Sequence, residues 1–157
     1  MVKLQFKTTI NASAESVYNA MLGKNTIETY QQWTSVFNPT STYEGGWDKG
    51  AKIYFIGTDE NGKKGGMVSE IAENIPFQFV SIRHYGILDG EIEITDGPAV
   101  QEWAGGFENY SFSEKNGVTT VSVAIDVTND FVAYFNTSWP KALVALKDLV
   151  ENKNTNL

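Results

Sequence analysis

The chain has 157 residues, of which 41% are apolar and 20% are charged, a composition typical of a globular domain and not of an intrinsically disordered chain. Its net charge of −7 argues against nucleic-acid binding and against attachment to anionic membranes, because both need a cationic surface. The absence of cysteine excludes disulfides, thiol nucleophiles and cysteine-bound metals. We therefore expect a single domain over residues 1–157.

Periodicity and turn residues divide the chain into strands and helices. Alternating apolar and polar side chains mark the strands, whereas apolar residues at three- and four-residue spacing mark the helices. In chain order, we expect a strand at 4–10, helices at 13–23 and 26–33, strands at 41–44, 52–57, 64–73, 77–85, 107–114 and 118–127, a long helix from 129 or 130, and a frayed tail at 151–157.

Several single residues set the ends of these elements. Ser13 suits the N-cap of the first helix, and Gly23 suits its C-terminal end. Asn61-Gly62 and Asn116-Gly117 are typical of tight hairpin turns, because both residue types tolerate positive φ. The strands are therefore expected to be joined largely as antiparallel hairpins.

Two segments are harder to interpret. Residues 86–106 are rich in glycine, and Pro98 favours a short helix or turn that ends near Trp103. In the long C-terminal helix, Pro140 lies inside an apolar stripe and predicts a kink or a break, with Ser138 as the cap of the second half.

This order of elements predicts an α+β fold. We expect a curved, mostly antiparallel sheet of about seven strands that grips the long C-terminal helix, with two short helices after the first strand. A strongly curved sheet around one helix leaves a space between them. That space is the natural place for a ligand.

Three parts of the sequence carry a family resemblance: residues 8–18, residues 66–76 with 79–82, and residues 139–149. They resemble the START-like superfamily, also called SRPBCC or Bet v 1-like helix-grip proteins. The last part is similar to the Trp-x-x-Ala-Leu-x-x-Leu helix of the branch related to the activator of the 90-kDa heat-shock chaperone ATPase. The resemblance implies a helix-grip fold with a hydrophobic cavity and, in one group, a role in stimulating a chaperone.

The aromatic side chains are the strongest functional signal, because rings with a few polar groups among them are typical of small-molecule sites. Within the set, His84 would orient the polar end of a ligand, and Trp103 would lie on a mobile lid between glycines. The choice of Tyr54 over Phe55 depends on strand register, since both are apolar. The expected cavity residues are Trp33, Tyr54, Val68, Ile82, His84, Trp103, Tyr110, Phe112, Phe135 and Trp139.

We expect this protein to bind a small apolar or amphipathic molecule without catalysing a reaction. A first alternative is an interaction protein of the chaperone-activator type, with a chaperone as its partner. A second alternative is a hydrolase or cyclase that uses His84 or Glu108 as its acid–base group.

Neither a metal nor a cofactor is expected. The chain has one histidine, and its acidic clusters lie in predicted turns without the spacing of a metal site. The N-terminus lacks the apolar core of a signal peptide, and no stretch is apolar enough to span a membrane. These features favour a cytoplasmic protein.

Overall fold

The computed structural model describes residues 1–155 and has the predicted α+β fold. Its sheet has eight strands instead of about seven, because a three-residue strand pairs beside the main path. The strands are β1 (Val2–Ile10), β2 (Thr42–Gly45), β3 (Lys52–Thr58), β4 (Lys64–Ile75), β5 (Phe79–Asp89), β6 (Ile92–Ile94), β7 (Gly106–Lys115) and β8 (Val118–Val127). The helices are α1 (Ala14–Leu22), α2 (Ile27–Thr34), the 3-10 helix η1 (Asn129–Phe131) and α3 (Val132–Thr155).

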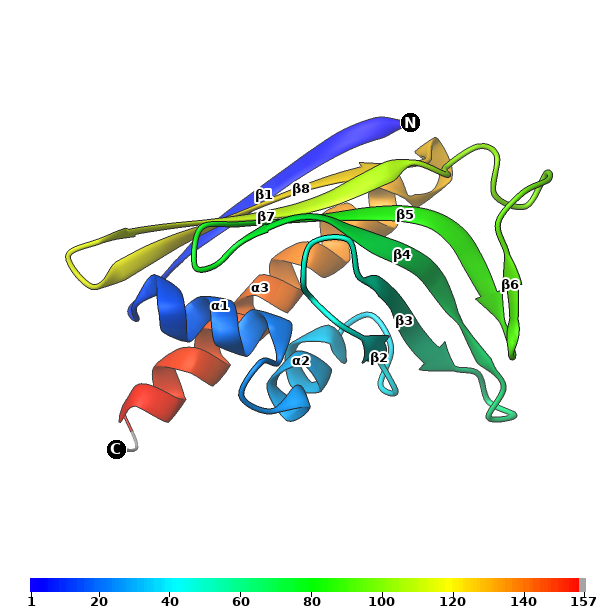
Figure 1. Cartoon of the computed structure of the whole chain (residues 1–157). Helices are drawn as coiled ribbons and strands as arrows, with labels where there is room; N and C mark the ends of the chain where they lie inside the picture. The colour runs from blue at the N-terminus through cyan, green and yellow to red at the C-terminus, as the bar shows by residue number, and fades with distance from the viewer. Residues whose placement is uncertain (156–157) are drawn as a thin grey trace.

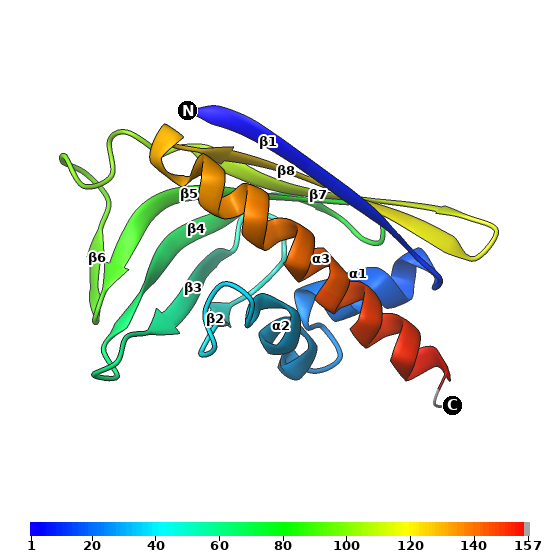
Figure 2. The same ribbon diagram turned by 180° about the vertical axis from the view of Figure 1, so that it is seen from behind.

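The strands form one antiparallel sheet in the order β1-β8-β7-β5-β4-β3-β2, and β6 pairs with the C-terminal end of β5. Figures 1 and 2 show α3 crossing one face of this sheet, with α1 and α2 beside it. The helices therefore cover one face, as expected for an antiparallel sheet with a single buried side.

Local signals in the sequence set most of the element ends. The Ser13 hydroxyl caps α1 by accepting a hydrogen bond from the Ser16 amide (3.1 Å). Gly23 ends the same helix with a left-handed φ of 68°. Asn116 and Gly117 both have positive φ, 55° and 79°, and form the predicted two-residue turn between β7 and β8.

The turn predicted at Asn61 is a longer loop. The Asp59 carboxylate accepts hydrogen bonds from the Asn61 and Lys63 amides, and of this loop only Gly62 has positive φ. An aspartate that satisfies two backbone amides favours this wider connection over the tight turn.

The expected break in the long helix is also absent. The α3 helix continues through Pro140, and the Ser138 hydroxyl donates to the Tyr134 carbonyl of the same helix (2.9 Å) instead of capping a second half. Buried side chains lie on both sides of the proline, and their packing outweighs the cost of about 3 kcal/mol of proline inside a helix. The tail expected to fray is helical as far as Thr155, and the rest of it, 156–157, lies outside the described residues.

Residues 86–106 contain a hairpin that the sequence interpretation missed. β5 continues to Asp89, Gly90 turns the chain with a φ of 65°, and β6 returns with Ile92 opposite Asp89. The segment around Pro98 is a series of turns and not a helix.

The sheet bends where β4 pairs with β5. The register shifts between Val68 and Ser69 and again between Ile71 and Glu73. Such bulges insert an unpaired residue and bend the strand that carries it. Figure 1 shows β3, β4 and β5 curving at one end, beyond the region where α3 lies close to the sheet.

The two parts of α3, before and beyond Pro140, differ in how they meet the sheet. Beyond Pro140, Ala142 and Leu146 are completely buried, and the small alanine permits close approach. Before Pro140, the Phe135 ring contacts that of Phe37 at a centroid distance of 6.3 Å, and the Trp139 ring contacts that of Tyr110 on β7 at 6.1 Å. The part beyond Pro140 therefore forms packed core, whereas the part before it makes its contacts through large rings.

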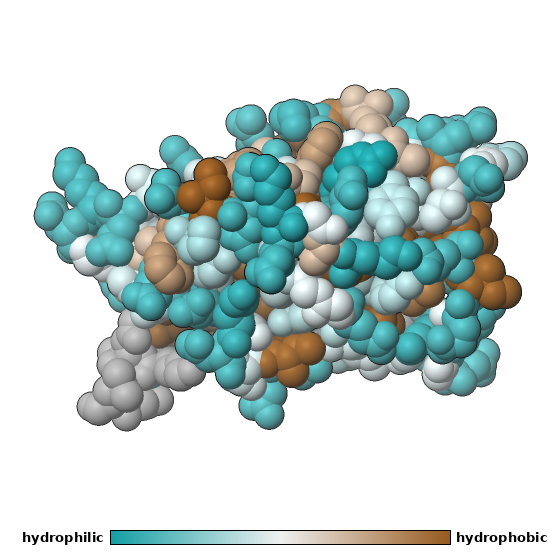
Figure 3. All heavy atoms as spheres, in the orientation of Figure 1, coloured by the Kyte–Doolittle hydropathy of each residue, from teal (hydrophilic) through white to brown (hydrophobic). Residues whose placement is uncertain are grey.

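Hydrophilic side chains cover most of the face seen in Figure 3, and the apolar ones lie there singly or in small groups. Among the described residues, the helices are too short or too polar to cross a lipid bilayer.

Gly66 is expected to be essential for the pairing of β3 with β4. It has a φ of 151°, and a Cβ at this position would overlap the Phe55 carbonyl oxygen. We expect Gly66→Ala to lower the free energy of unfolding by more than about 3 kcal/mol. Gly62→Ala is the matched control, because Gly62 also has positive φ but nothing lies within 4 Å of its Cβ.

The control should cost about 1 kcal/mol, the penalty of a left-handed backbone alone. Urea unfolding of both variants and the wild type measures the difference. An equal loss in the two variants would contradict the close approach of β3 to β4.

Candidate functional site

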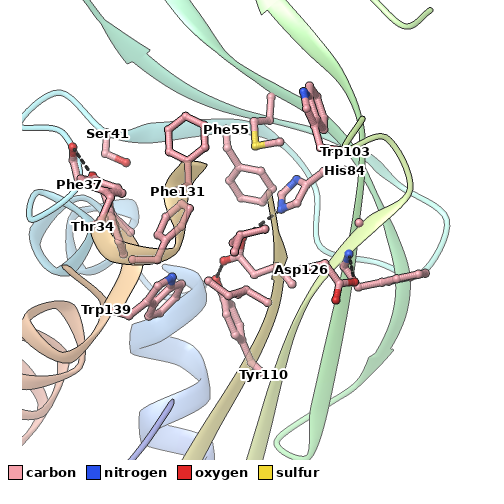
Figure 4. Close-up of a pocket in the computed structure, with 18 of the residues that line it drawn as sticks. Thr34, Phe37, Ser41, Phe55, His84, Trp103, Tyr110, Asp126, Phe131 and Trp139 are labelled. Atoms are coloured by element: carbon pink, nitrogen blue, oxygen red, sulfur yellow. Dashed lines mark hydrogen bonds and ion pairs between the residues drawn. The ribbon is translucent and has the colours of Figure 1, made fainter. Parts of the chain in front are cut away.

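A cavity of about 460 Å³ lies between the bent part of the sheet and the N-terminal half of α3. The side chains labelled in Figure 4 come from the sheet, from helices and, for Phe37, Ser41 and Trp103, from connecting segments. Most of its walls are aromatic. The rings that line it are Tyr30, Trp33, Phe37, Phe55, Trp103, Phe107, Tyr110, Phe131, Tyr134, Phe135 and Trp139.

Trp139 is the centre of the aromatic wall on the helix side. Its ring centroid lies 5.1 Å from that of Phe37, 5.7 Å from that of Trp33 and 6.1 Å from that of Tyr110. Tilted and edge-on contacts at these distances are favourable for aromatic pairs. Side chains from α2, α3 and β7 thus hold one another in place before any ligand is present.

The position of α2 follows from the end of α1. The last carbonyls of a helix have no partner within the helix. The Trp33 indole N–H donates to the Met21 carbonyl (2.9 Å), and the Tyr43 hydroxyl donates to the Leu22 carbonyl (2.9 Å). These bonds satisfy the end of α1 and fix Trp33 at the cavity wall.

A row of four polar side chains crosses β4, β5 and β7 at one end of the cavity. Ser69 Oγ lies 2.6 Å from His84 Nδ1, and His84 Nε2 lies 3.0 Å from Glu108 Oε1. The Tyr110 hydroxyl donates to the other Glu108 oxygen, Oε2. Figure 4 shows the bonds that join His84 and Tyr110 through the carboxylate between them.

The partners of His84 place a proton on one ring nitrogen. An ionised carboxylate only accepts, so Nε2 carries a proton and donates it to Glu108. The direction of the hydrogen bond between the Ser69 hydroxyl and Nδ1 depends on the tautomer. Ser69 is completely buried, whereas the side chain of Glu108 is 23% exposed. The row has the groups of a Ser–His–acid triad, but the carboxylate and not the hydroxyl faces the cavity.

Burial and the charge of Glu108 together raise the pKa of two tyrosines of the cavity. Burial raises the pKa of Tyr110 well above its ordinary value, and the nearby Glu108 charge raises it further. Burial and then Glu108 also raise the pKa of Tyr30. Both phenols therefore remain neutral donors at physiological pH.

The mouth of the cavity carries a second carboxylate and a tryptophan. Asp126 accepts a hydrogen bond from the Phe107 amide (3.0 Å) and forms an ion pair with Lys3 (3.0 Å). Burial opposes ionisation of Asp126, but the Phe107 amide and Lys3 outweigh it and lower the pKa. Trp103 reaches the cavity from the turn segment before β7, where its indole donates to the Ala99 carbonyl (3.1 Å).

Within the described part of the chain, no three histidine or acidic side chains come together as metal ligands. Six of the ten residues expected from the sequence line the cavity: Trp33, His84, Trp103, Tyr110, Phe135 and Trp139.

Tyr54 and Val68 lie on the opposite face of the sheet. They are direct partners in the pairing of β3 with β4, so both point away from the cavity. The Tyr54 hydroxyl donates there to Glu93 (2.7 Å). Phe55 takes the inward position instead. The two adjacent residues are both apolar, so the sequence does not show which one faces the cavity, and the expected register was wrong by one residue.

Ile82 and Phe112 point to the helical face but do not line the cavity. Ile82 is completely buried in the main core, and Phe112 packs edge-on against Tyr18 of α1 at a centroid distance of 5.6 Å. They lie where the sheet and the helices are in contact, and not where the sheet bends away.

Several cavity residues were not expected. Phe131 belongs to the apolar stripe of the predicted helix. Met67 is the direct partner of Phe55 in the pairing of β3 with β4, so it faces the cavity once the register of β3 is known. Phe37 lies between α2 and β2 and had no sequence signal. Glu108 enters the sequence-based hypotheses only as an acid–base group, because its contact with His84 spans 24 residues.

The whole chain matches solved structures of the same fold. The solution structure of the Aha1 dimer from Colwellia psychrerythraea is 25% identical, covers 96% of this chain and 97% of that one, and has a TM-score of 0.68. Protein ChR145 from Cytophaga hutchinsonii is 19% identical over 99% and 97% of the two chains, with a TM-score of 0.71. Protein NE0264 from Nitrosomonas europaea is 13% identical over 98% and 97%, with a TM-score of 0.71.

No protein-family model and no curated protein matches the chain. The strand order and the gripped helix give this chain the helix-grip fold that these solved structures share. The chain resembles the Aha1 structure over nearly its whole length, in agreement with the resemblance noted in the sequence. The two neighbours below 25% identity support the fold alone.

Two tyrosines test the role of the polar row. Tyr110→Phe removes the donor to Glu108 Oε2 but keeps the ring, so we expect the free energy of unfolding to fall by about 1 kcal/mol or more. Tyr54→Phe removes an equivalent bond to Glu93, which is 31% exposed and also pairs with Lys52 (3.0 Å).

This control should cost less than about 0.5 kcal/mol, because water and Lys52 replace the lost donor. Urea unfolding of the two variants gives the comparison. If both variants lose the same stability, the Tyr110–Glu108 bond has no special importance for the cavity.

Proposed function

We propose that this protein acts in the cytoplasm as a single domain that binds one small apolar or amphipathic molecule, without catalysing a reaction. The observation that supports the proposal is the aromatic cavity of about 460 Å³ with one polar row. Small-molecule sites have this form: a few hundred cubic ångströms, mostly apolar walls and a few polar groups that fix orientation.

The division of α3 supports the same proposal. Beyond Pro140, its buried side chains Ala142, Leu143 and Leu146 form part of the main core. Before Pro140, the rings of Phe135 and Trp139 line the cavity. An apolar ligand that fills the hollow would remove these rings from water, which is favourable in proportion to the area covered.

The polar row favours binding over nucleophilic catalysis. A serine nucleophile must reach the bound molecule, whereas Ser69 is completely buried behind His84. Its hydroxyl instead orients the imidazole. The alternative of a hydrolase or cyclase with His84 or Glu108 as acid–base group stays a hypothesis, which turnover lost in a folded His84→Ala variant would support.

Tryptophan fluorescence measures the proposed binding directly, because Trp33, Trp103 and Trp139 all line the cavity. We expect uncharged ligands such as 1-decanol or a flavonoid to change this fluorescence in a saturable way. Ile125→Trp should weaken binding at least tenfold, since Ile125 lines the cavity and the larger ring would fill part of it.

Ala124→Trp is the matched control, because Ala124 precedes Ile125 on β8 and points to the opposite face. Its affinity should remain within twofold of the wild type, measured by calorimetry so that the added tryptophan does not interfere. An absence of saturable binding in the wild type, or equal weakening in both variants, would contradict the proposal.

A second candidate is a chaperone-activator-type interaction. The similarity to the Aha1 structure over 96% of the chain supports it. For this function, the purified protein should increase the ATPase rate of a bacterial 90-kDa heat-shock chaperone at least twofold. Ile125→Trp should leave the increase intact, because the partner would contact the surface and not the cavity. No increase over the chaperone alone would rule this candidate out.

A further inference from the structure

The polar row places a carboxylate at the cavity end with no lysine or arginine beside it. Glu108 accepts hydrogen bonds from the His84 imidazole and the Tyr110 hydroxyl. Among the described residues that line the cavity, none is lysine or arginine. These two hydrogen bonds stabilise the negative charge of Glu108.

The other carboxylate of the cavity is already compensated. Asp126 lies 3.0 Å from the Lys3 ammonium and accepts the Phe107 amide. The charge of Asp126 is therefore paired with that of Lys3. Glu108 has no lysine or arginine beside it and presents its carboxylate to the cavity.

Glu108 also has room for another donor. A carboxylate offers about four lone-pair positions, and His84 and Tyr110 use one on each oxygen. Its side chain is 23% exposed and lines the cavity. A positively charged N–H group of a ligand would make a charge-assisted hydrogen bond there, the stronger kind of hydrogen bond.

The surrounding rings favour the same charge. The centroid of Phe55 lies 5.9 Å from that of His84, and the centroid of Trp33 lies 6.5 Å from that of Tyr110. The faces of such rings attract cations, most strongly in sites that exclude water. The net charge of −7 also concentrates cations near the protein and repels anions.

We propose that the cavity selects a hydrophobic amine, with its ammonium group on Glu108 and its apolar body among the aromatic rings. This inference rests on the proposed function, because it names the ligand class for the same cavity. Fatty acids and other hydrophobic anions are disfavoured, since their charged group would lie beside the Glu108 carboxylate in a cavity that no lysine or arginine lines.

Three ligands of equal chain length test the inference: decylamine, 1-decanol and decanoate, each titrated by calorimetry at neutral pH. We expect the wild-type protein to bind decylamine at least tenfold more tightly than 1-decanol, and decanoate more weakly than both. This comparison needs no variant, so it holds even where a substitution disturbs the fold.

Glu108→Gln keeps the shape of the side chain and removes its charge. We expect the advantage of decylamine over 1-decanol, measured as the ratio of their two affinities, to fall at least tenfold. Glu93→Gln is the matched control, because Glu93 also accepts a tyrosine hydroxyl but lies on the opposite face of the sheet. It should leave all three affinities unchanged.

The outcomes separate the two levels of the proposal. Binding of 1-decanol with no preference for decylamine, or a preference for decanoate, overturns the amine inference and leaves the proposed function standing. A decylamine advantage that survives Glu108→Gln in a variant with wild-type thermal unfolding also overturns it. Failure of the wild-type protein to bind any of the three overturns the proposed function, and the inference with it.

Discussion

The irregular pairing of β4 with β5 at Val68 and Ser69 is the constraint on which the cavity depends. A regular sheet could lie flat against the whole length of α3, and its rings would then be ordinary core. The bulge bends the sheet away from the N-terminal half of the helix, and the rings on α2 and α3 are left facing a hollow. Gly66 contributes to the same region, because its missing Cβ allows the Phe55 carbonyl to approach.

The bulge also determines the chemistry at the end of the hollow. It brings Ser69 opposite His84. The serine hydroxyl therefore hydrogen-bonds to Nδ1 of the imidazole, while Nε2 of the same ring bonds to Glu108. A buried hydroxyl and an accessible carboxylate support the proposed ligand binding over nucleophilic attack by Ser69. One fold can carry many functions. The arrangement of Ser69, His84 and Glu108 therefore says more about function than the similarity to other helix-grip structures does.

Much of the fold could be predicted from the sequence, because the signals that specify it act over a few residues. A serine cap, a left-handed glycine and an Asn-Gly turn act within one turn of chain, and the helical stripe of α3 needs only its own spacing. The same reasoning places Trp33, Phe135 and Trp139 on the cavity side. Pro140 shows the limit, since distant packing kept a helix that local propensity would interrupt.

The sequence by itself determined the elements, their order and the apolar faces, whereas the tertiary structure decided the register and the meeting of distant side chains. Tyr54 and Phe55 are both apolar, so only the pairing of β3 with β4 selects which ring faces inward. Glu108 meets His84 because β5 and β7 are neighbours in the sheet. Register depends on the summed contacts of whole strands, and no local pattern of residues contains that sum.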